Sequence, residues 1–158
     1  MPRPSIMPAR FYGTRRLRAV LRSFLPLATA AYVSGSLALP DPKVIVNSSV
    51  EVERISLNDA RLLLTARLAT WPDMSPVTVF VLPDDSPLHD DFARSVLQLF
   101  PYQLRRTWDR QLFSGTGRAP TVVRSEAEML RQVEATPGAI GYVERIPEGV
   151  DVRELIVQ

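Results

Sequence analysis

Val77–Phe92, VTVFVLPDDSPLHDDF, is the stretch that decides the fold. Its first residues have the alternating apolar pattern of a strand, and an acidic turn follows. Ser86 and Pro87 then begin a helix, since Ser before the first turn and Pro at its first position are preferred at helix starts. The first N–H groups of a helix have no partner, and the helix dipole favours negative charge, so such a junction commonly binds anions. The stretch predicts a strand–turn–helix unit with a candidate binding loop.

Upstream of this unit, the pattern predicts one strand and one helix. Val44–Asn47 is a continuous apolar run, which is typical of a buried strand. Ser56 then begins a helix, with Asp59 near the position that a capping box requires. We expect its apolar stripe to consist of Leu57, Ala60, Leu64 and Leu68.

Downstream, helices and strands continue to alternate. We expect one helix from Ser86 to about Phe100, and a third helix from Pro101 with Leu104, Trp108 and Leu112 facing inward. A capping box over residues 125–128 begins a fourth helix, and strands are predicted near 121–123 and at 139–143 and 152–157. The predicted fold class is α/β, a central mixed sheet flanked by helices.

The first 38 residues differ from the rest of the chain in charge and composition. They contain six arginines, no acidic residue, and the short apolar run Phe24–Val33, which small residues at 36–38 follow. These are the features of a secretory signal peptide, and the run is shorter than the roughly 20 residues that a membrane span needs. We predict a signal peptide over 1–38, a domain over 39–158, and a periplasmic or secreted location. An uncleaved anchor is the alternative.

The predicted domain is acidic. From residue 39 onward the chain has 13 basic and 17 acidic residues, a net charge of −4, although the whole chain carries +2. Binding to a nucleic-acid backbone needs a basic face, so we predict no nucleic-acid partner. The chain has no cysteine, which excludes disulfides and thiol chemistry.

The order of these segments resembles one lobe of the type II periplasmic binding protein fold, in particular the phosphate-binding components of bacterial ABC importers. The matching landmarks are VIVN (44–47), ISLNDARLLLTARLATWPD (55–73), VTVFVLPDDSP (77–87), Phe92, WDRQLFSGTG (108–117) and ATPGAIGYV (135–143). Small stand-alone secreted proteins with this pattern form a phosphate-binding-like family, which this chain resembles. The resemblance implies a non-catalytic protein that binds phosphate or a related oxyanion and has a membrane or periplasmic protein partner.

The resemblance also implies that the ligand loop is degraded. In the transporter proteins an Arg ends the strand, and a Ser-Gly-Thr opens the helix. Here Ser86 matches the Ser, but Leu82, Pro87 and Leu88 stand in place of the Arg, the Gly and the Thr, and each change removes a donor. Four aspartates around Ser86 also oppose an anion: Asp84, Asp85, Asp90 and Asp91.

Three interpretations of this loop stay open. Ser86 and its neighbours can simply form a stable helix start, Ser86 can hold an oxyanion weakly, or the acidic surface can meet a cation or a basic partner. A second candidate for anion binding is the loop of Ser114 and the four residues after it, although a plain helix-ending turn is the alternative. Its candidate site residues are Gly115, Thr116, Gly117 and Arg118.

The sequence predicts no enzyme, no metal site and no cofactor. His89 is the only histidine, and a metal site normally requires several His, Cys or carboxylate ligands. No Ser-His-Asp arrangement is suggested by order or spacing. Two functions from different classes remain: a small-oxyanion binder, and a protein-interaction or sensor module that kept the lobe but lost the ligand.

Overall fold

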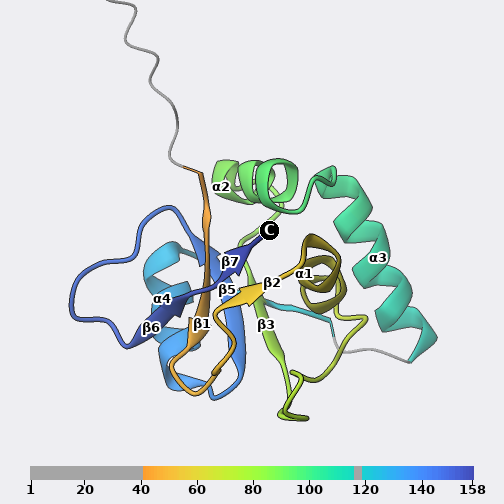
Figure 1. The fold of residues 1–158 in the computed structure, drawn as a ribbon. Helices are drawn as coiled ribbons and strands as arrows, with labels where there is room; N and C mark the ends of the chain where they lie inside the picture. The colour runs from red at the N-terminus through yellow and green to blue at the C-terminus, as the bar shows by residue number, and fades with distance from the viewer. Residues whose placement is uncertain (1–40, 116–118) are drawn as a thin grey trace, which may run out of the picture. The chain divides into compact units, whose positions relative to one another are not determined.

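The structure, a computed structural model, describes residues 41–115 and 119–158. Its main element is a five-stranded sheet with the strand order β4-β3-β5-β1-β6 (Figure 1). β3 runs parallel to β4 and β5, whereas β1 is antiparallel to β5 and β6, so the sheet is mixed as predicted. The strands of this sheet are β1 (Lys43–Asn47), β3 (Thr78–Val81), β4 (Thr121–Val122), β5 (Ala139–Val143) and β6 (Val152–Glu154). A smaller sheet pairs β2 (Arg54–Ile55) with β7 (Ile156–Val157).

Helices cover both faces of the main sheet (Figure 1). They are α1 (Leu57–Leu64), α2 (Pro87–Asp91), the π-helix η1 (Phe92–Val96), α3 (Pro101–Ser114) and α4 (Glu126–Ala135). Two neighbouring residues of β5 point to opposite faces, as in any strand. A Cβ on Gly141 would lie 2.5 Å from the sulfur of Met129 on α4. The ring of Tyr142, on the other face, stacks on Phe92 at a centroid distance of 3.7 Å.

Two of the predicted helix starts are confirmed in detail. The Ser56 hydroxyl accepts from the Asp59 N–H at 3.1 Å, and the Ser125 hydroxyl accepts from the Glu128 N–H at 3.2 Å. The end of α1 differs from the prediction. The helix stops at Leu64, Ala66 adopts a left-handed conformation with φ of 56°, and Leu68 lies outside the helix.

The prediction of a single helix from Ser86 to about Phe100 is wrong. The short α2 passes directly into η1, where the Leu97 N–H donates to the Phe92 carbonyl at 3.2 Å across five residues. A π-turn contains one residue more than an α-turn, so it changes which side chains face inward. Here both Phe92 and Leu97 are buried.

α3 begins and packs as predicted but is exposed at its end. Leu104 and Trp108 are buried, and the Trp108 indole N–H donates to the Leu64 carbonyl at the end of α1, at 3.0 Å. One turn farther along, Leu112 is 57% exposed, which corrects the prediction that it faces inward. The reason is that α1 has already ended there, so the last turn of α3 has no helix to pack against.

Candidate functional site

The candidate binding loop connects the end of β3 to α2. Leu82, which stands where the resemblance would require an Arg, is buried at 4% exposure. The chain then turns, and the Ser86 N–H closes the turn by donating to the Pro83 carbonyl at 3.0 Å. Pro87 is the first residue of α2. An anion at this junction would therefore meet an apolar strand end and a turn that is already closed on itself.

Most backbone donors of the loop are engaged inside the fold. The Leu82 N–H donates to the Tyr142 hydroxyl oxygen at 2.9 Å. The N–H groups of His89 and Asp90 donate to the Ser86 carbonyl at 3.0 and 3.2 Å. Pro87 has no N–H to offer. An anion would have to displace these bonds, and an anion that leaves water without new donors is strongly destabilised.

Ser86 occupies the N-cap position of α2, with φ of −74° and ψ of 125°, but its side chain makes no capping hydrogen bond. The helix start predicted from the sequence is therefore present, although the Ser86 hydroxyl does not cap it. Ser56 and Ser125, by contrast, both cap their helices through the hydroxyl. The hydroxyl of Ser86 is therefore a polar group of the predicted ligand loop that the helix start does not use.

We expect Ser86→Ala to change the free energy of unfolding by less than about 0.5 kcal/mol, because no capping bond is lost. Ser125→Ala, which removes a capping bond, should cost about 1 kcal/mol. Urea denaturation followed by circular dichroism measures both values. An equal loss in the two variants would show that Ser86 caps α2 in solution.

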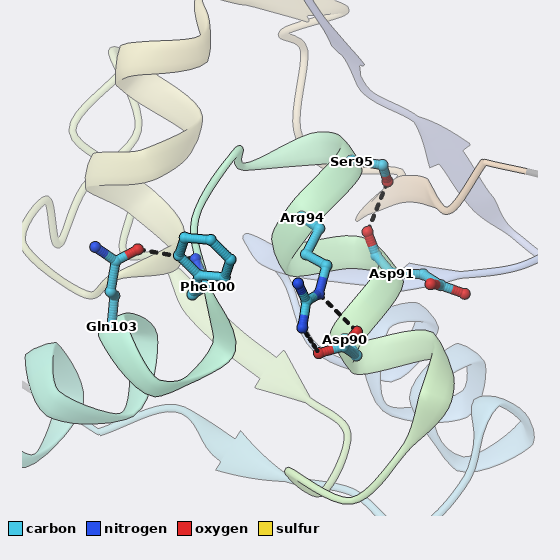
Figure 2. Close-up of polar contacts among 6 residues, drawn as sticks. All are labelled: Asp90, Asp91, Arg94, Ser95, Phe100 and Gln103. Carbon is cyan, nitrogen blue, oxygen red and sulfur yellow. Dashed lines mark hydrogen bonds and ion pairs between the residues drawn. The ribbon is translucent and has the colours of Figure 1, made fainter.

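Two of the four aspartates around Ser86 are already paired. The Asp84 carboxylate lies 2.6 Å from the Arg105 guanidinium on α3, and Asp90 binds Arg94 one helical turn later at 2.7 Å (Figure 2). Asp85 and Asp91 form no ion pair with any residue of the described ranges. The loop surface therefore carries two negative charges outside ion pairs, Asp85 and Asp91, and these disfavour the binding of an anion.

His89 is fully buried directly beneath this loop. Its Nδ1 lies 2.5 Å from the Tyr142 hydroxyl oxygen, and its Nε2 has no hydrogen-bond partner among the residues that the structure describes. Because the Leu82 N–H donates to the phenol oxygen, we assign the phenol proton to the bond with Nδ1, which leaves the imidazole proton on Nε2. Burial lowers the pKa of His89 below its usual 6.5; the positive charge of Arg105 lowers it further, whereas the negative charges of Asp84 and Asp90 raise it, each by less than burial lowers it. His89 is therefore neutral at pH 7.

Tyr142 lies on β5, and its hydroxyl group contacts both the Leu82 N–H and His89 Nδ1. Burial raises the pKa of its phenol, so the phenol keeps its proton. The His89 ring lies 6.0 Å from the Tyr142 ring and 5.8 Å from the Trp108 ring. The sequence pattern led us to weigh His89 for a metal site and a catalytic triad, and this buried cluster was not predicted. A signal was available, since His89 precedes the inward-facing Phe92 by three residues, and that spacing places both on one helix face.

The second candidate loop lies elsewhere. Gly115 ends α3 in a left-handed conformation with φ of 66°, which fits the helix-ending turn. It lines a cavity of about 580 Å³ together with Thr78 and Thr121, at the starts of β3 and β4. Ser86 follows the opposite end of β3, so Gly115 and Ser86 do not share one pocket. Thr116, Gly117 and Arg118 lie outside the described residues, and their part in binding stays a prediction.

Comparisons with known proteins agree with this architecture. No protein-family model matches the chain, and no curated protein matches it in sequence. Among solved structures, the chain is similar to a protein from Clostridium perfringens that is assigned as a phosphate ABC transporter substrate-binding protein and was solved with bound phosphate (15% identity, TM-score 0.58). It is also similar to an ABC-type phosphate transport receptor from Vibrio cholerae (11%, 0.52) and to PstS from Borrelia burgdorferi (14%, 0.55).

These matches concern about half of each larger protein. They cover 74%, 74% and 75% of this chain, but only 44%, 46% and 47% of the three solved chains. At such low identity they show the fold alone. The chain has the α/β fold of a single lobe of the type II periplasmic binding proteins.

Proposed function

We propose that this chain is an exported, non-catalytic single-lobe protein that works as a protein-interaction module and has lost efficient phosphate capture. The observation that carries the proposal is that backbone N–H groups of the loop already donate hydrogen bonds inside the fold. The Leu82, Ser86 and His89 N–H groups are all bound within the fold, and the position of the expected Arg is a buried leucine. These internal bonds, within a fold that keeps the lobe, support the loss of efficient anion capture.

A second argument comes from how binding proteins of this fold enclose a ligand. Binding proteins of this fold enclose a ligand between two lobes that close about a hinge. A ligand on one lobe keeps much of its surface in water, so tight capture requires a second wall. The solved phosphate transport proteins are about twice as long as the matched part of this chain. The described residues supply one such wall, and its loop already makes internal hydrogen bonds, which supports a surface function of this lobe better than ligand capture by this lobe alone.

Weak oxyanion binding is the second candidate. Its support is the fold shared with a protein solved with bound phosphate, together with the Ser86 hydroxyl that makes no capping bond. Under this alternative, Ser86 and Gly115 would belong to separate sites, because Gly115 lies near the start of β3 and Ser86 follows its end.

Export of the domain also stays part of the proposal. Among the described residues, no helix has the length and the apolar character that a membrane crossing demands. The predicted signal peptide lies outside these residues. Its composition, six arginines before a short apolar run, is what supports a periplasmic or secreted location.

Titration calorimetry of the domain over residues 39–158 with phosphate and sulfate separates the two candidates. We expect no heat of binding with a Kd below about 100 μM, because the donors are engaged and the loop is negative. Ser86→Ala is the test variant, and Ser125→Ala is a matched control at another helix start. Binding in this range that weakens only in Ser86→Ala would overturn the proposal in favour of the oxyanion binder.

A further inference from the structure

The cavity at the start of β3 lies at the opposite end of that strand from the Ser86 loop. Its volume of about 580 Å³ is within the range of small-molecule sites. Its walls come from the chain after α1, the start of β3, the end of α3 and the start of β4. None of its described lining residues takes part in the hydrogen bonds of the Ser86 loop. The cavity is therefore separate from the candidate binding loop.

Backbone hydrogen bonds hold one wall of this cavity in place. The chain leaves α1 through Ala66, which has a positive φ of 56°, and the Arg67 N–H donates to the Leu62 carbonyl at 2.9 Å. The same wall is tied to the start of β3, because the Val77 N–H donates to the Ala69 carbonyl at 2.9 Å. A positive φ in a residue other than glycine is uncommon and persists where the surroundings enforce it. The fold itself therefore orders this wall.

Apolar residues form much of the lining. On the two segments 66–69 and 76–79 they are Ala66, Leu68, Ala69, Pro76, Val77 and Val79. Leu68 is 37% exposed, so the core of the domain covers it only in part. An apolar group that enters the cavity leaves water, which is favourable in proportion to the apolar area that it buries. The lining therefore favours an organic ligand over an inorganic ion.

Arg67 is the one charged residue among the described residues that line the cavity. Within residues 41–115 and 119–158 its side chain forms no ion pair and no hydrogen bond. By contrast, the side chains of Arg61, Arg94 and Arg105 all donate to acceptors of the domain. A guanidinium group presents paired N–H donors that match the two oxygens of a carboxylate. The unpaired charge of Arg67 therefore favours a carboxylate and disfavours a cation.

We propose that this cavity binds a small organic monocarboxylate with an apolar body. The carboxylate pairs with the Arg67 guanidinium, and the apolar body lies against Leu68 and Val79. Thr78 and Thr121 also line the cavity, and neither hydroxyl has a hydrogen-bond partner among the described residues. A few polar groups on an otherwise apolar lining are the usual composition of a small-molecule site.

This inference goes beyond the proposed function and does not rest on it. The proposed function concerns the Ser86 loop and the loss of efficient phosphate capture there. The carboxylate site shares no lining residue with that loop and requires a different ligand. The two proposals are therefore tested with different probes.

NMR titration of the protein with hexanoate, hexan-1-ol and hexylammonium is the test, followed through the backbone amide signals. We expect saturable binding of hexanoate with a Kd of about 0.1–1 mM, a range that a ligand of about eight heavy atoms can reach. The amide signals of Leu68, Val79 and Thr121 should shift. Hexan-1-ol should bind at least about tenfold more weakly, because it lacks the charge that pairs with Arg67. Hexylammonium should bind more weakly still, because its charge repels the guanidinium.

Two variants separate the charge from the apolar lining. Arg67→Gln should weaken hexanoate binding at least about tenfold and leave hexan-1-ol binding unchanged. Leu68→Ser should weaken both ligands, because both bury an apolar chain. The matched control is Arg131→Gln, which removes an exposed arginine of α4 that does not line the cavity, and it should bind hexanoate as the wild type does. Circular dichroism confirms that each variant is folded.

Three results would overturn the carboxylate site. They are the lack of saturable binding up to about 10 mM hexanoate, equal affinities for hexanoate and hexan-1-ol, and an Arg67→Gln variant that binds hexanoate like the wild type. In the last case, a loss of binding in Arg118→Gln would assign the ligand to the predicted loop after Gly115 instead.

The outcomes of the two tests are separable. A protein that binds neither hexanoate nor phosphate keeps the proposed function and loses the carboxylate site. A protein that binds hexanoate through Arg67 and phosphate through Ser86 keeps the carboxylate site and loses the proposed function.

Discussion

Gly138→Ala is expected to lower the free energy of unfolding by about 3 kcal/mol. Gly138 has φ of +70°, a conformation that an L side chain adopts only with strain, and an added Cβ would overlap the Pro76 carbonyl oxygen. The backbone cannot move aside easily. The Gly138 carbonyl accepts from the Trp71 indole N–H at 2.9 Å, and its N–H donates to the Ser49 hydroxyl at 3.1 Å.

Gly149→Ala is the matched control for this prediction. Gly149 also has a positive φ, +82°, but a Cβ there would meet nothing within 4 Å. It should therefore show only the conformational cost, about 1 kcal/mol. Urea denaturation of both variants gives the two values. Equal losses would mean that the close approach of Pro76 relaxes at little cost.

Acidification from pH 7 to pH 5 is expected to destabilise the protein through His89 by up to about 2 kcal/mol. Burial holds the pKa of His89 below 6.5 in the folded state, so the unfolded chain takes up a proton that the folded protein rejects. The stabilisation is complete above pH 6.5 and decreases as the pH falls below that value. Protonation would also disturb the hydrogen bonds, since Nδ1 would then donate to a Tyr142 oxygen that already accepts from Leu82.

This titration can be assigned because the chain has one histidine. Denaturation curves at several pH values between 5 and 8 should show a slope in the wild type that His89→Asn lacks, since an amide oxygen can accept from Tyr142 but does not titrate. The imidazole signals in NMR spectra report the folded pKa directly. Parallel pH dependences of the two proteins, or an imidazole that titrates at 6.5, would contradict the prediction.

The sequence predicted those elements whose signals are local. The continuous apolar run of β1 and the capping serines Ser56 and Ser125 each act within a few residues, and the structure confirms them. Leu104 and Trp108 are buried, as the apolar stripe of α3 predicted. Together these elements fixed the α/β class before any tertiary contact was known.

The features that escaped prediction depend on distant contacts. The π-turn of η1 has no local signature here and is favoured because it buries both Phe92 and Leu97. The engaged state of the loop arises from Tyr142, 60 residues beyond Leu82 in sequence. The family resemblance identified Leu82, Pro87 and Leu88 as lost donors. It could not reveal that the N–H groups of Leu82, Ser86 and His89 are bound inside the fold.

The hydrogen bond between the Leu82 N–H and the Tyr142 phenol has a consequence for how this domain could transmit information. A loop whose backbone is fixed by the core before any ligand arrives gains little further order upon binding, so occupancy would change neither its flexibility nor its entropy. A response to a ligand or partner would therefore arise from the molecules that the surface charge attracts, and not from a change in the motion of the loop.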